Sequence, residues 1–355
     1  MNLPYIRNNH LESAEEMIAI KELYNSISYG ESFIIPTRNQ YLVAAKMSRA
    51  QHLKTFYQST SPSNPSFLFK NINQLYSHTC SRPQYTSLLL ETFQDQIACV
   101  LPSCRLPGVD GNIIATLSDH PVTQKILEYS TLPLAVHLLS QNQHPVITNI
   151  QTASAIFKEE LPIFDGGRCS IGISPTILDC SNSGEIVIKR LGTISLRDIK
   201  TLLPDVIVRE EIINIYSSKP FLHFVSSFAE IPSDQDVTLI GTHEKLLECI
   251  PNLRKNGYFH QEKVDNMNIF NIGSQTDFVH IAKNIHEHLH QAYTNSTGSI
   301  FVLPFSTKTH WARLIAQELA QFRYLMPFYR DIETTSDLIN NSSNFYFTRL
   351  TGNLT

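Results

Sequence analysis

The 355-residue chain lacks the glycine-rich signatures that mark the commonest phosphate-binding and acyl-transfer sites. It contains no G-x-x-x-x-G-K-[ST] motif, no G-x-G-x-x-G after a strand pattern and no G-x-S-x-G turn. These absences exclude an ordinary P-loop, a dinucleotide fingerprint and an α/β-hydrolase nucleophile elbow. Charged residues make up only 17% of the chain and the net charge is −4, so no overall basic field attracts nucleic acid.

Paired cysteines and long apolar runs are also missing. The six cysteines include no C-x-x-C pair, which favours reduced thiols over a disulfide framework or a zinc knuckle. The first residues, MNLPYIRNNH, do not have the basic-then-apolar order of a signal peptide, and no apolar run is long enough to cross a bilayer. We therefore expect a cytoplasmic protein that has no membrane partner.

Length and composition predict two domains. A chain of 355 residues with 42% hydrophobic residues can fill two cores of ordinary size. In its second part, alternating strand and helix patterns run over 237–241, 244–250, 268–272, 276–293, 299–304 and 310–323. This alternation is typical of a small parallel α/β sheet.

The first part contains the most informative stretch, residues 163–195, which we interpret as a β-ribbon. Two strand patterns flank the turn residues 181–184, and a pair of adjacent glycines precedes them. Arg190 then lies two residues before Gly192, so that a guanidinium and an accessible backbone together favour an anion. From the residues alone, the ribbon is either an anion-binding rim or an ordinary structural hairpin.

This ribbon resembles the nucleotide site of the YrdC-like family, the threonylcarbamoyl-AMP synthases. In that family Gly-Ile-Glu-Ser-Thr-Ile-Val-Asp leads into a hairpin and then Arg-Pro-Gly, and here the frame reads GISPTILD over 172–179 and KRLGTI over 189–194. The family's helix, Gly, strand, Pro-Thr opening is similar to the stretch that ends at Thr37, and its strand, Asp-His-Pro, helix step is similar to 113–129. The resemblance spans nearly the whole chain, to about Ile332.

The resemblance implies an α/β fold: a YrdC-like twisted mixed sheet with helices, plus a smaller C-terminal Rossmann-like parallel α/β domain. We accordingly expect a YrdC-like nucleotide- and threonine-binding domain at 1–205 and a Rossmann-like domain at 237–332. Between them we expect a linker at 206–236 that contains His223 and folds over the active site. A polar tail is expected at 333–355.

The family's motifs also imply a set of site residues. The substrate- and nucleotide-binding positions that match them are Thr37, Tyr41, Ser140, Asn142, Thr176 and Arg190. In the family, the matching threonine and tyrosine of the Pro-Thr turn help to form the substrate pocket. The resemblance identifies no catalytic residue.

The chain departs from the family where positive charge is needed. The family's phosphate-holding Lys-x-Arg has no counterpart in 57–66, and its arginine before Asp-His-Pro is Thr116 here. Losing a charge-assisted phosphate contact costs roughly 1.5 to 3 kcal/mol. Arg38, Lys46 and Arg168 are candidate compensating cations, with simple surface solvation as the alternative for each.

Two functions follow from the resemblance. The first is a divergent L-threonylcarbamoyladenylate synthase, which condenses L-threonine, bicarbonate and ATP into threonylcarbamoyl-AMP and pyrophosphate for tRNA modification. It would use Mg²⁺ with ATP, because negative charge builds up at the phosphates, and its expected partners are tRNA or tRNA-modification enzymes. The second is a catalytically degenerate paralogue that acts as a nucleotide-, RNA- or protein-binding module.

A remote third alternative is a zinc hydrolase, because residues 286–290 read HEHLH and satisfy H-E-x-x-H. On a helix, His286 and His290 would be one turn apart, with Glu287 as base and Glu318 as a third ligand. However, apolar residues recur at helical spacing through the same segment, which predicts a core-facing helix with its histidines on the polar margin. We therefore expect no metal held by protein side chains.

Overall fold

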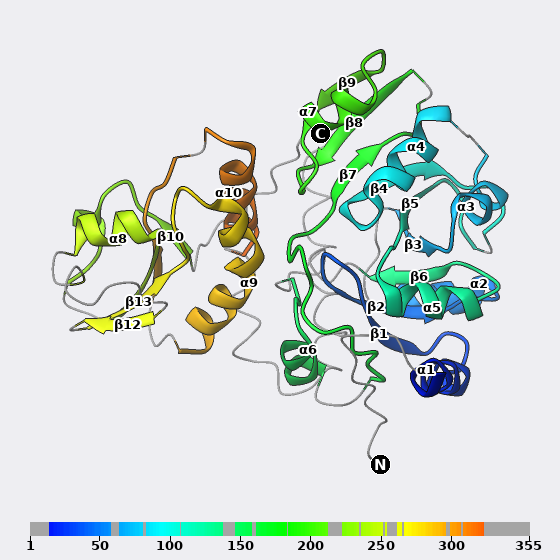
Figure 1. The fold of residues 1–355 in the computed structure, drawn as a ribbon, viewed down its shortest axis with the longest axis horizontal. Helices are drawn as coiled ribbons and strands as arrows, with labels where there is room; N and C mark the ends of the chain where they lie inside the picture. Colours follow the sequence, from blue (N-terminus) through cyan, green and yellow to red (C-terminus); the bar gives the residue numbers. More distant parts are fainter. Residues whose placement is uncertain are drawn as a thin grey trace, which may run out of the picture.

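The computed structural model describes residues 14–57, 64–80, 83–106, 108–137, 146–157, 161–182, 184–211, 222–233, 236–250, 253, 261–264, 266–295, 299–306 and 308–322. These residues form a nine-stranded and a five-stranded β-sheet with helices packed on their faces (Figure 1). Within these ranges no helix combines the length and the apolar character that a membrane span requires.

The large sheet is mixed and confirms the expected α/β class. Its strands are β1 (Ser32–Pro36), β2 (Tyr41–Lys46), β3 (Ser66–Phe69), β4 (Ile97–Pro102), β5 (Asn112–Leu117), β6 (Leu134–His137), β7 (Thr176–Asp179), β8 (Glu185–Arg190) and β9 (Ile207–Glu210). They lie in the order β1-β2-β6-β3-β5-β4-β7-β8-β9. The pairs β3/β5, β4/β7 and β8/β9 are parallel and the other neighbours are antiparallel.

Helices cover both faces of this sheet. They are α1 (Ala14–Ser26), α2 (Ala50–Tyr57), α3 (Ile72–His78), α4 (Gln84–Phe93), the 3₁₀ turn η1 (Gln94–Gln96), α5 (Pro121–Tyr129), α6 (Ile150–Phe157) and α7 (Leu196–Leu202). Side chains alternate along β1, so Phe33 and Ile35 pack with α1 and α5 whereas Ile34 joins the core on the opposite face. This alternation determines which face of the sheet each side chain of β1 occupies where the chain enters the following turn.

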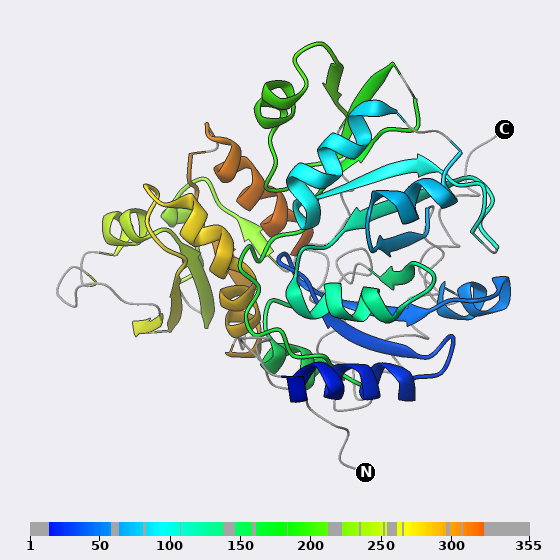
Figure 2. The same ribbon diagram turned by 45° about the vertical axis from the view of Figure 1, so that its right-hand side comes forward.

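The small sheet contains the alternating elements that the sequence predicts. Its strands are β10 (Leu222–Phe224), β11 (Val237–Gly241), β12 (Gln261–Val264), β13 (Met267–Asn271) and β14 (Ser299–Val302), in the order β10-β14-β11-β13-β12. Every neighbouring pair is parallel except β12/β13. The other elements are η3 (Phe228–Glu230), α8 (His243–Cys249), α9 (Phe278–Asn295) and α10 (His310–Phe322). Helices α9 and α10 lie on the side that faces the large sheet (Figures 1 and 2).

The range 206–236, expected to be a linker, contains two strands instead. β9 pairs with β8 at the edge of the large sheet, and β10 pairs with β14 at the edge of the small one. Val208 of β9 and Leu222 of β10 are buried, whereas Ile207 of β9 is 66% exposed. His223 lies in β10, where its ring stacks on Phe301 at a centroid distance of 5.1 Å. The connection at 212–221 and the expected tail at 333–355 lie outside the described residues.

The two sheets share one hydrophobic core. Leu191 and Ile194 of the large unit belong to the same cluster of buried side chains as Ile281 and Leu314 of α9 and α10. Polar contacts complete this interface: His310 Nε2 lies 2.9 Å from the carbonyl oxygen of Gly192, Gln317 Nε2 donates to the carbonyl of Leu191 at 3.1 Å, and Arg313 is 3.2 Å from Glu210. The ribbon at 163–195 is therefore packed against α9 and α10.

Folding brings two pairs of thiols together that the sequence spacing does not reveal. Backbone pairing of Thr79 with Ser103 places the exposed Cys80 and Cys104 side by side, and hydrogen bonding with Cys104 raises the pKa of Cys80. The second pair, Cys99 and Cys180, is buried, and hydrogen bonding with Cys99 raises the pKa of Cys180. All four are free thiols.

Candidate functional site

The turn between β1 and β2 carries the first of the predicted site residues, Thr37. Its backbone N–H and its hydroxyl both donate to the carbonyl of Gln40, at 2.9 and 2.8 Å. The same hydroxyl accepts the backbone N–H groups of Asn39 and Gln40 at 3.2 and 3.1 Å. Thr37 is buried, so its hydroxyl closes the turn and fixes the direction of the side chains that follow.

Tyr41, the next predicted residue, joins this turn to the adjacent glycines of the ribbon. Its buried hydroxyl donates to the carbonyl of Gly167 at 2.6 Å, accepts the N–H of Gly166 at 3.0 Å and lies 3.3 Å from Asp165 Oδ1. Burial raises the pKa of Tyr41 well above its ordinary value, so it stays a neutral donor. Gly166 has no room for a side chain, since a Cβ there would lie 2.4 Å from His120 Cε1.

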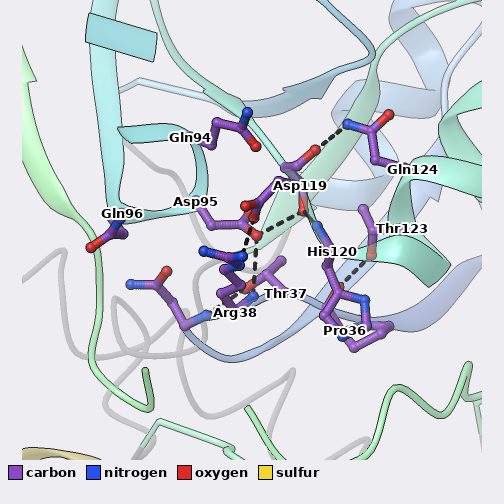
Figure 3. Close-up of polar contacts among 12 residues, drawn as sticks. Pro36, Thr37, Arg38, Gln94, Asp95, Gln96, Asp119, His120, Thr123 and Gln124 are labelled. Atoms are coloured by element: carbon purple, nitrogen blue, oxygen red, sulfur yellow. Dashed lines mark hydrogen bonds and ion pairs between the residues drawn. The ribbon is translucent and has the colours of Figure 1, made fainter. Parts of the chain in front are cut away.

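Beside the turn lies a polar cluster that includes Arg38, Asp95, Asp119 and His120 (Figure 3). Asp95 is only 3% exposed, and its Oδ2 accepts the backbone N–H of Arg38 at 3.1 Å and the Ser118 hydroxyl at 3.0 Å. The Arg38 guanidinium reaches Asp119 at 3.0 Å. Burial raises the pKa of Asp95 to about 7, neighbouring Asp119 adds to the rise, and the two hydrogen bonds oppose it. Asp95 can therefore gain or lose a proton near neutral pH.

Two residues near Asp95 are unusual, Gln94 in its backbone angle and His120 in its pKa. Gln94, directly before it, has a φ of 44°, a region that non-glycine residues rarely occupy and that commonly costs about 1 to 3 kcal/mol. Burial lowers the pKa of His120 to about 4, so its ring is neutral at physiological pH and adds no positive charge. Sequence reasoning missed Asp95, although a carboxylate between an apolar helix pattern and an apolar strand pattern was a signal that could have found it.

A cavity of about 20 Å³ opens between this turn and Asp95. The described residues that line it are Thr37, Asn39, Gln40, Leu42, Ser66, Leu68, Asp95, Ile114, Thr116, Val136 and Pro175. Among the described residues, three buried side-chain atoms of this lining have no hydrogen-bond partner: Asn39 Oδ1, Gln40 Oε1 and Gln40 Nε2. A space of this size takes one small polar group.

Thr176 and Arg190, the predicted nucleotide-binding residues of the ribbon, make contacts within the protein. The Thr176 hydroxyl donates to the carbonyl of Ile194 at 2.9 Å and accepts its N–H at 3.2 Å. The half-buried Arg190 guanidinium donates to the carbonyl of Pro175 at 2.9 and 3.3 Å. Burial lowers the pKa of Arg190, and Glu318 of α10 counteracts it. Of these residues, only Pro175 lines the cavity.

The backbone is packed so closely around position 192 that only glycine fits there. A Cβ at this position would lie 2.1 Å from the backbone nitrogen of Thr176 and 2.4 Å from the carbonyl carbon of Pro175. The glycine therefore permits a close approach of two backbone segments within the ribbon. The backbone at Gly192, which the sequence predicts to be accessible to an anion, is therefore in contact with other protein backbone.

The three candidate compensating cations lie in different places. Lys46 donates to the carbonyl of Tyr24 in α1 at 2.7 Å, and its ammonium lies 4.4 Å from the centre of the Tyr24 ring. Arg168 pairs with Glu287 of α9 at 2.7 Å. Only Arg38 lies beside the cavity, and Asp119 neutralises it. Ser140 and Asn142 lie outside the described residues, as do 58–63 of the stretch that lacks the Lys-x-Arg.

The zinc alternative stays untested, because the side chain of His290 lies outside the described residues. Glu287, the expected base, is engaged by Arg168, and the buried His286 Nε2 lies 3.1 Å from Glu318 Oε2. Within the part of the chain that the structure describes, no group of three or more His, Cys, Asp or Glu side chains is placed to hold a metal ion.

Comparison with known proteins adds three findings. The Sua5–YciO–YrdC family model, described as "Telomere recombination", matches residues 25–192. The threonylcarbamoyl-AMP synthase of Bacillus subtilis (strain 168) is 23% identical over 184 residues, which cover 49% of this chain and 53% of that protein. The match thus spans about half the length of the curated relative.

Solved structures resemble the whole fold. A double variant of P. abyssi Sua5 superimposes with a TM-score of 0.68 at 16% identity, covering 91% of this chain and 97% of that one. P. abyssi Sua5 complexed with L-threonine gives a TM-score of 0.64 at 16% identity, covering 88% and 96%. At this identity the likeness shows that the two-sheet fold is shared.

Proposed function

The chain belongs to the YrdC-like family through residues 25–192, and on this basis we propose that it is a divergent threonylcarbamoyl-AMP synthase. The proposed reaction condenses L-threonine, bicarbonate and ATP into threonylcarbamoyl-AMP and pyrophosphate. The product would serve the modification of tRNA, with tRNA or tRNA-modification enzymes as partners. Mg²⁺ would enter with ATP and offset the charge of its phosphates, and we assign it no protein ligand.

The observation that carries this proposal is the turn at 37–41. It lies inside the matched family domain, Tyr41 ties it to the Gly166–Gly167 backbone, and it forms one wall of the cavity. Thr37 supports the shape of that wall through three hydrogen bonds within the turn. A rigid wall of this kind suits a reaction that depends on positioning its substrates.

Pyrophosphate release tests the proposal. Purified protein with L-threonine, bicarbonate and Mg-ATP should release pyrophosphate only when threonine is present. Tyr41→Phe should lower kcat/KM about tenfold, because the cavity wall loses its link to Gly166 and Gly167 and about 1.4 kcal/mol corresponds to a factor of ten. The matched control is Tyr29→Phe, at an exposed position of the same domain. A threonine-independent signal, or none at all, would refute the proposal.

A second candidate, the catalytically degenerate binding module, is favoured by one observation. Arg38, Lys46, Arg168 and Arg190 all have partners within the chain, so each would have to exchange a contact before it could bind a phosphate. Titration with Mg-ATP separates the two functions in part, because a nucleotide-binding module would also bind ATP but would release no pyrophosphate. A protein that binds no ATP and releases no pyrophosphate would be a module for RNA or protein.

A further inference from the structure

Two exposed thiols meet where the chain after α3 runs beside the chain after β4. Thr79 pairs with Ser103 there as an isolated antiparallel β-bridge. The backbone N–H groups of the next residues, Cys80 and Cys104, each donate to a carbonyl of the opposite segment, at 3.0 and 3.1 Å. Because these two hydrogen bonds flank the bridge, they hold the backbone of both cysteines in one register.

This register places the two thiols on the same face. Successive side chains of an extended segment point to opposite faces, so Cys80 and Cys104 share the face opposite to Thr79 and Ser103. They lie diagonally across the bridge and hydrogen-bond to each other. Thr79 is buried, whereas both cysteines are exposed. The thiols are therefore accessible to a dissolved reagent as well as to one another.

The surroundings of the pair favour a thiolate, which is the form of cysteine that attacks a disulfide. In a hydrogen-bonded pair, the thiol that keeps its proton donates it to the other sulfur and so stabilises the thiolate that forms first. Hydrogen bonding with Cys104 accordingly raises the pKa of Cys80, and the positive charge of Arg105 opposes this rise. A cation beside a thiol pair is typical of reactive cysteines.

We propose that Cys80 and Cys104 form a reversible modification site for small disulfides of the glutathione disulfide class, with an intramolecular disulfide as the product. In the first step, one cysteine thiolate attacks a sulfur of glutathione disulfide, a mixed disulfide forms and one glutathione leaves as its thiolate. In the second step, the other cysteine loses its proton to the solvent and attacks the protein sulfur of the mixed disulfide, which expels the second glutathione. Two electrons pass from the cysteines to glutathione disulfide, which becomes two molecules of glutathione.

The second step is favoured because it takes place within the protein. The flanking hydrogen bonds keep the second thiol close to the first, so its effective concentration exceeds that of dissolved glutathione. The two side chains are already in hydrogen-bonding contact. We therefore expect side-chain rotation to suffice for a sulfur–sulfur bond of about 2.05 Å, without opening of the bridge.

Other cysteines of the chain provide matched comparisons. Cys99 and Cys180 also hydrogen-bond to each other, but both are buried. Cys249 of α8 is partly exposed, and it lies beside charged side chains of its own helix. Contact without exposure should leave a pair of thiols reduced, and exposure without a neighbouring thiol should stop the reaction at the mixed disulfide.

The disulfide would join the end of α3 to the chain after β4 and close a loop that contains α4 and β4. Such a bond restricts the unfolded chain, so the oxidised protein should melt about 3 to 5 °C higher than the reduced protein. Cys104 follows the end of β4 whereas Asp95 precedes its beginning, so the site is separate from the polar cluster. This inference therefore goes beyond the proposed function and does not depend on it.

Equilibration in glutathione redox buffers tests the inference. The full chain is incubated with rising ratios of glutathione disulfide to glutathione, quenched with acid and alkylated after unfolding, and its intact mass and peptides are measured. We expect a peptide pair joined through Cys80 and Cys104, with the loss of two hydrogen atoms, and its reversal by excess glutathione. Cys249 should carry glutathione, while Cys99 and Cys180 should remain as thiols.

Three substitutions sharpen the test. Cys80→Ser and Cys104→Ser, both at exposed positions, should each stop at a mixed disulfide on the remaining cysteine and lose the shift in melting temperature. The matched control, Cys249→Ser, should keep both the bond and the shift. Should a variant fail to fold, the mass and melting temperature of the unaltered protein decide.

Three results would overturn the inference: glutathione attached to both Cys80 and Cys104 without a bond between them, a disulfide between two molecules, or a melting temperature that oxidation leaves unchanged. None of these measurements involves pyrophosphate. A protein that forms the bond but releases no pyrophosphate keeps the modification site and refutes the synthase, and the opposite outcome does the reverse.

Discussion

Replacing Asp95 with Asn should change how the stability of the protein depends on pH. The pKa of this carboxyl rises from 3.8 to about 7 on folding, so the folded state holds a proton that the unfolded state has released between these pH values. Stability therefore falls as pH rises through that window. At 1.36 kcal/mol for each pKa unit, about 2.6 kcal/mol of the loss lies between pH 5 and pH 8. Asparagine cannot ionise, but it keeps an oxygen for the Arg38 N–H and the Ser118 hydroxyl.

Thermal unfolding of both proteins at pH 5 and pH 8 measures this effect. We expect the two melting temperatures to differ by about 3 to 4 °C more at pH 8 than at pH 5, in favour of Asp95→Asn, because an unfolding entropy of about 2.1 cal/mol/K per residue makes 1 kcal/mol correspond to about 1.3 °C in a chain of 355 residues. Asp110→Asn, at an exposed position, should follow the unaltered protein at both pH values. Parallel pH profiles of the unaltered protein and Asp95→Asn would show that the carboxyl is ionised in the folded state, and the reasoning would be wrong.

Three further predictions concern the ribbon, the cavity wall and the thiols. Gly192→Ala should lower the free energy of unfolding, measured in urea, by roughly 1 to 3 kcal/mol or more. Gly184→Ala is the control and should be nearly neutral, because its Cβ would meet no atom closer than 3.7 Å. Equal effects of the two substitutions would contradict the close approach at Gly192. Tyr41→Phe should cost roughly 1 to 3 kcal/mol in the same assay, because two backbone groups lose their partner, and a change below 0.5 kcal/mol would argue against that link. With oxidised glutathione, Cys80 and Cys104 should form a disulfide while the buried thiols stay reduced, and peptide mass mapping measures this. Oxidation of the buried thiols with Cys80 and Cys104 left reduced would rule out the proximity of Cys80 and Cys104.

Much of the fold could be predicted because its signals are local. Strands β11, β13 and β14 of the small sheet are mostly apolar, and α9 and α10 carry apolar stripes, so composition and period identify these elements. The short strands β9 and β10 give no such signal, since three or four residues cannot show a period. The sequence therefore predicts a linker there, although β10 pairs with β14, which lies far along the chain, and β9 pairs with β8 across helix α7.

The candidate site was less predictable because its contacts are distant in sequence. Asp95 reaches Arg38 across 57 residues and Asn39 reaches Ile173 across 134, and no local pattern encodes such pairs. The basic residues show the same limit. Arg168 and Lys46 have the charge that a phosphate site needs, but the sequence cannot say that Glu287 and Tyr24 lie closer to them.

The shared core has a consequence for how this protein can be divided. Ending the chain near residue 211 would expose Leu191 and Ile194 to water, together with the apolar side of the ribbon that α9 and α10 cover. The second unit also docks through the main-chain carbonyls of residues 191 and 192, which the side chains of Gln317 and His310 contact. Loss of the second unit would therefore leave an aggregation-prone remnant with an exposed apolar surface.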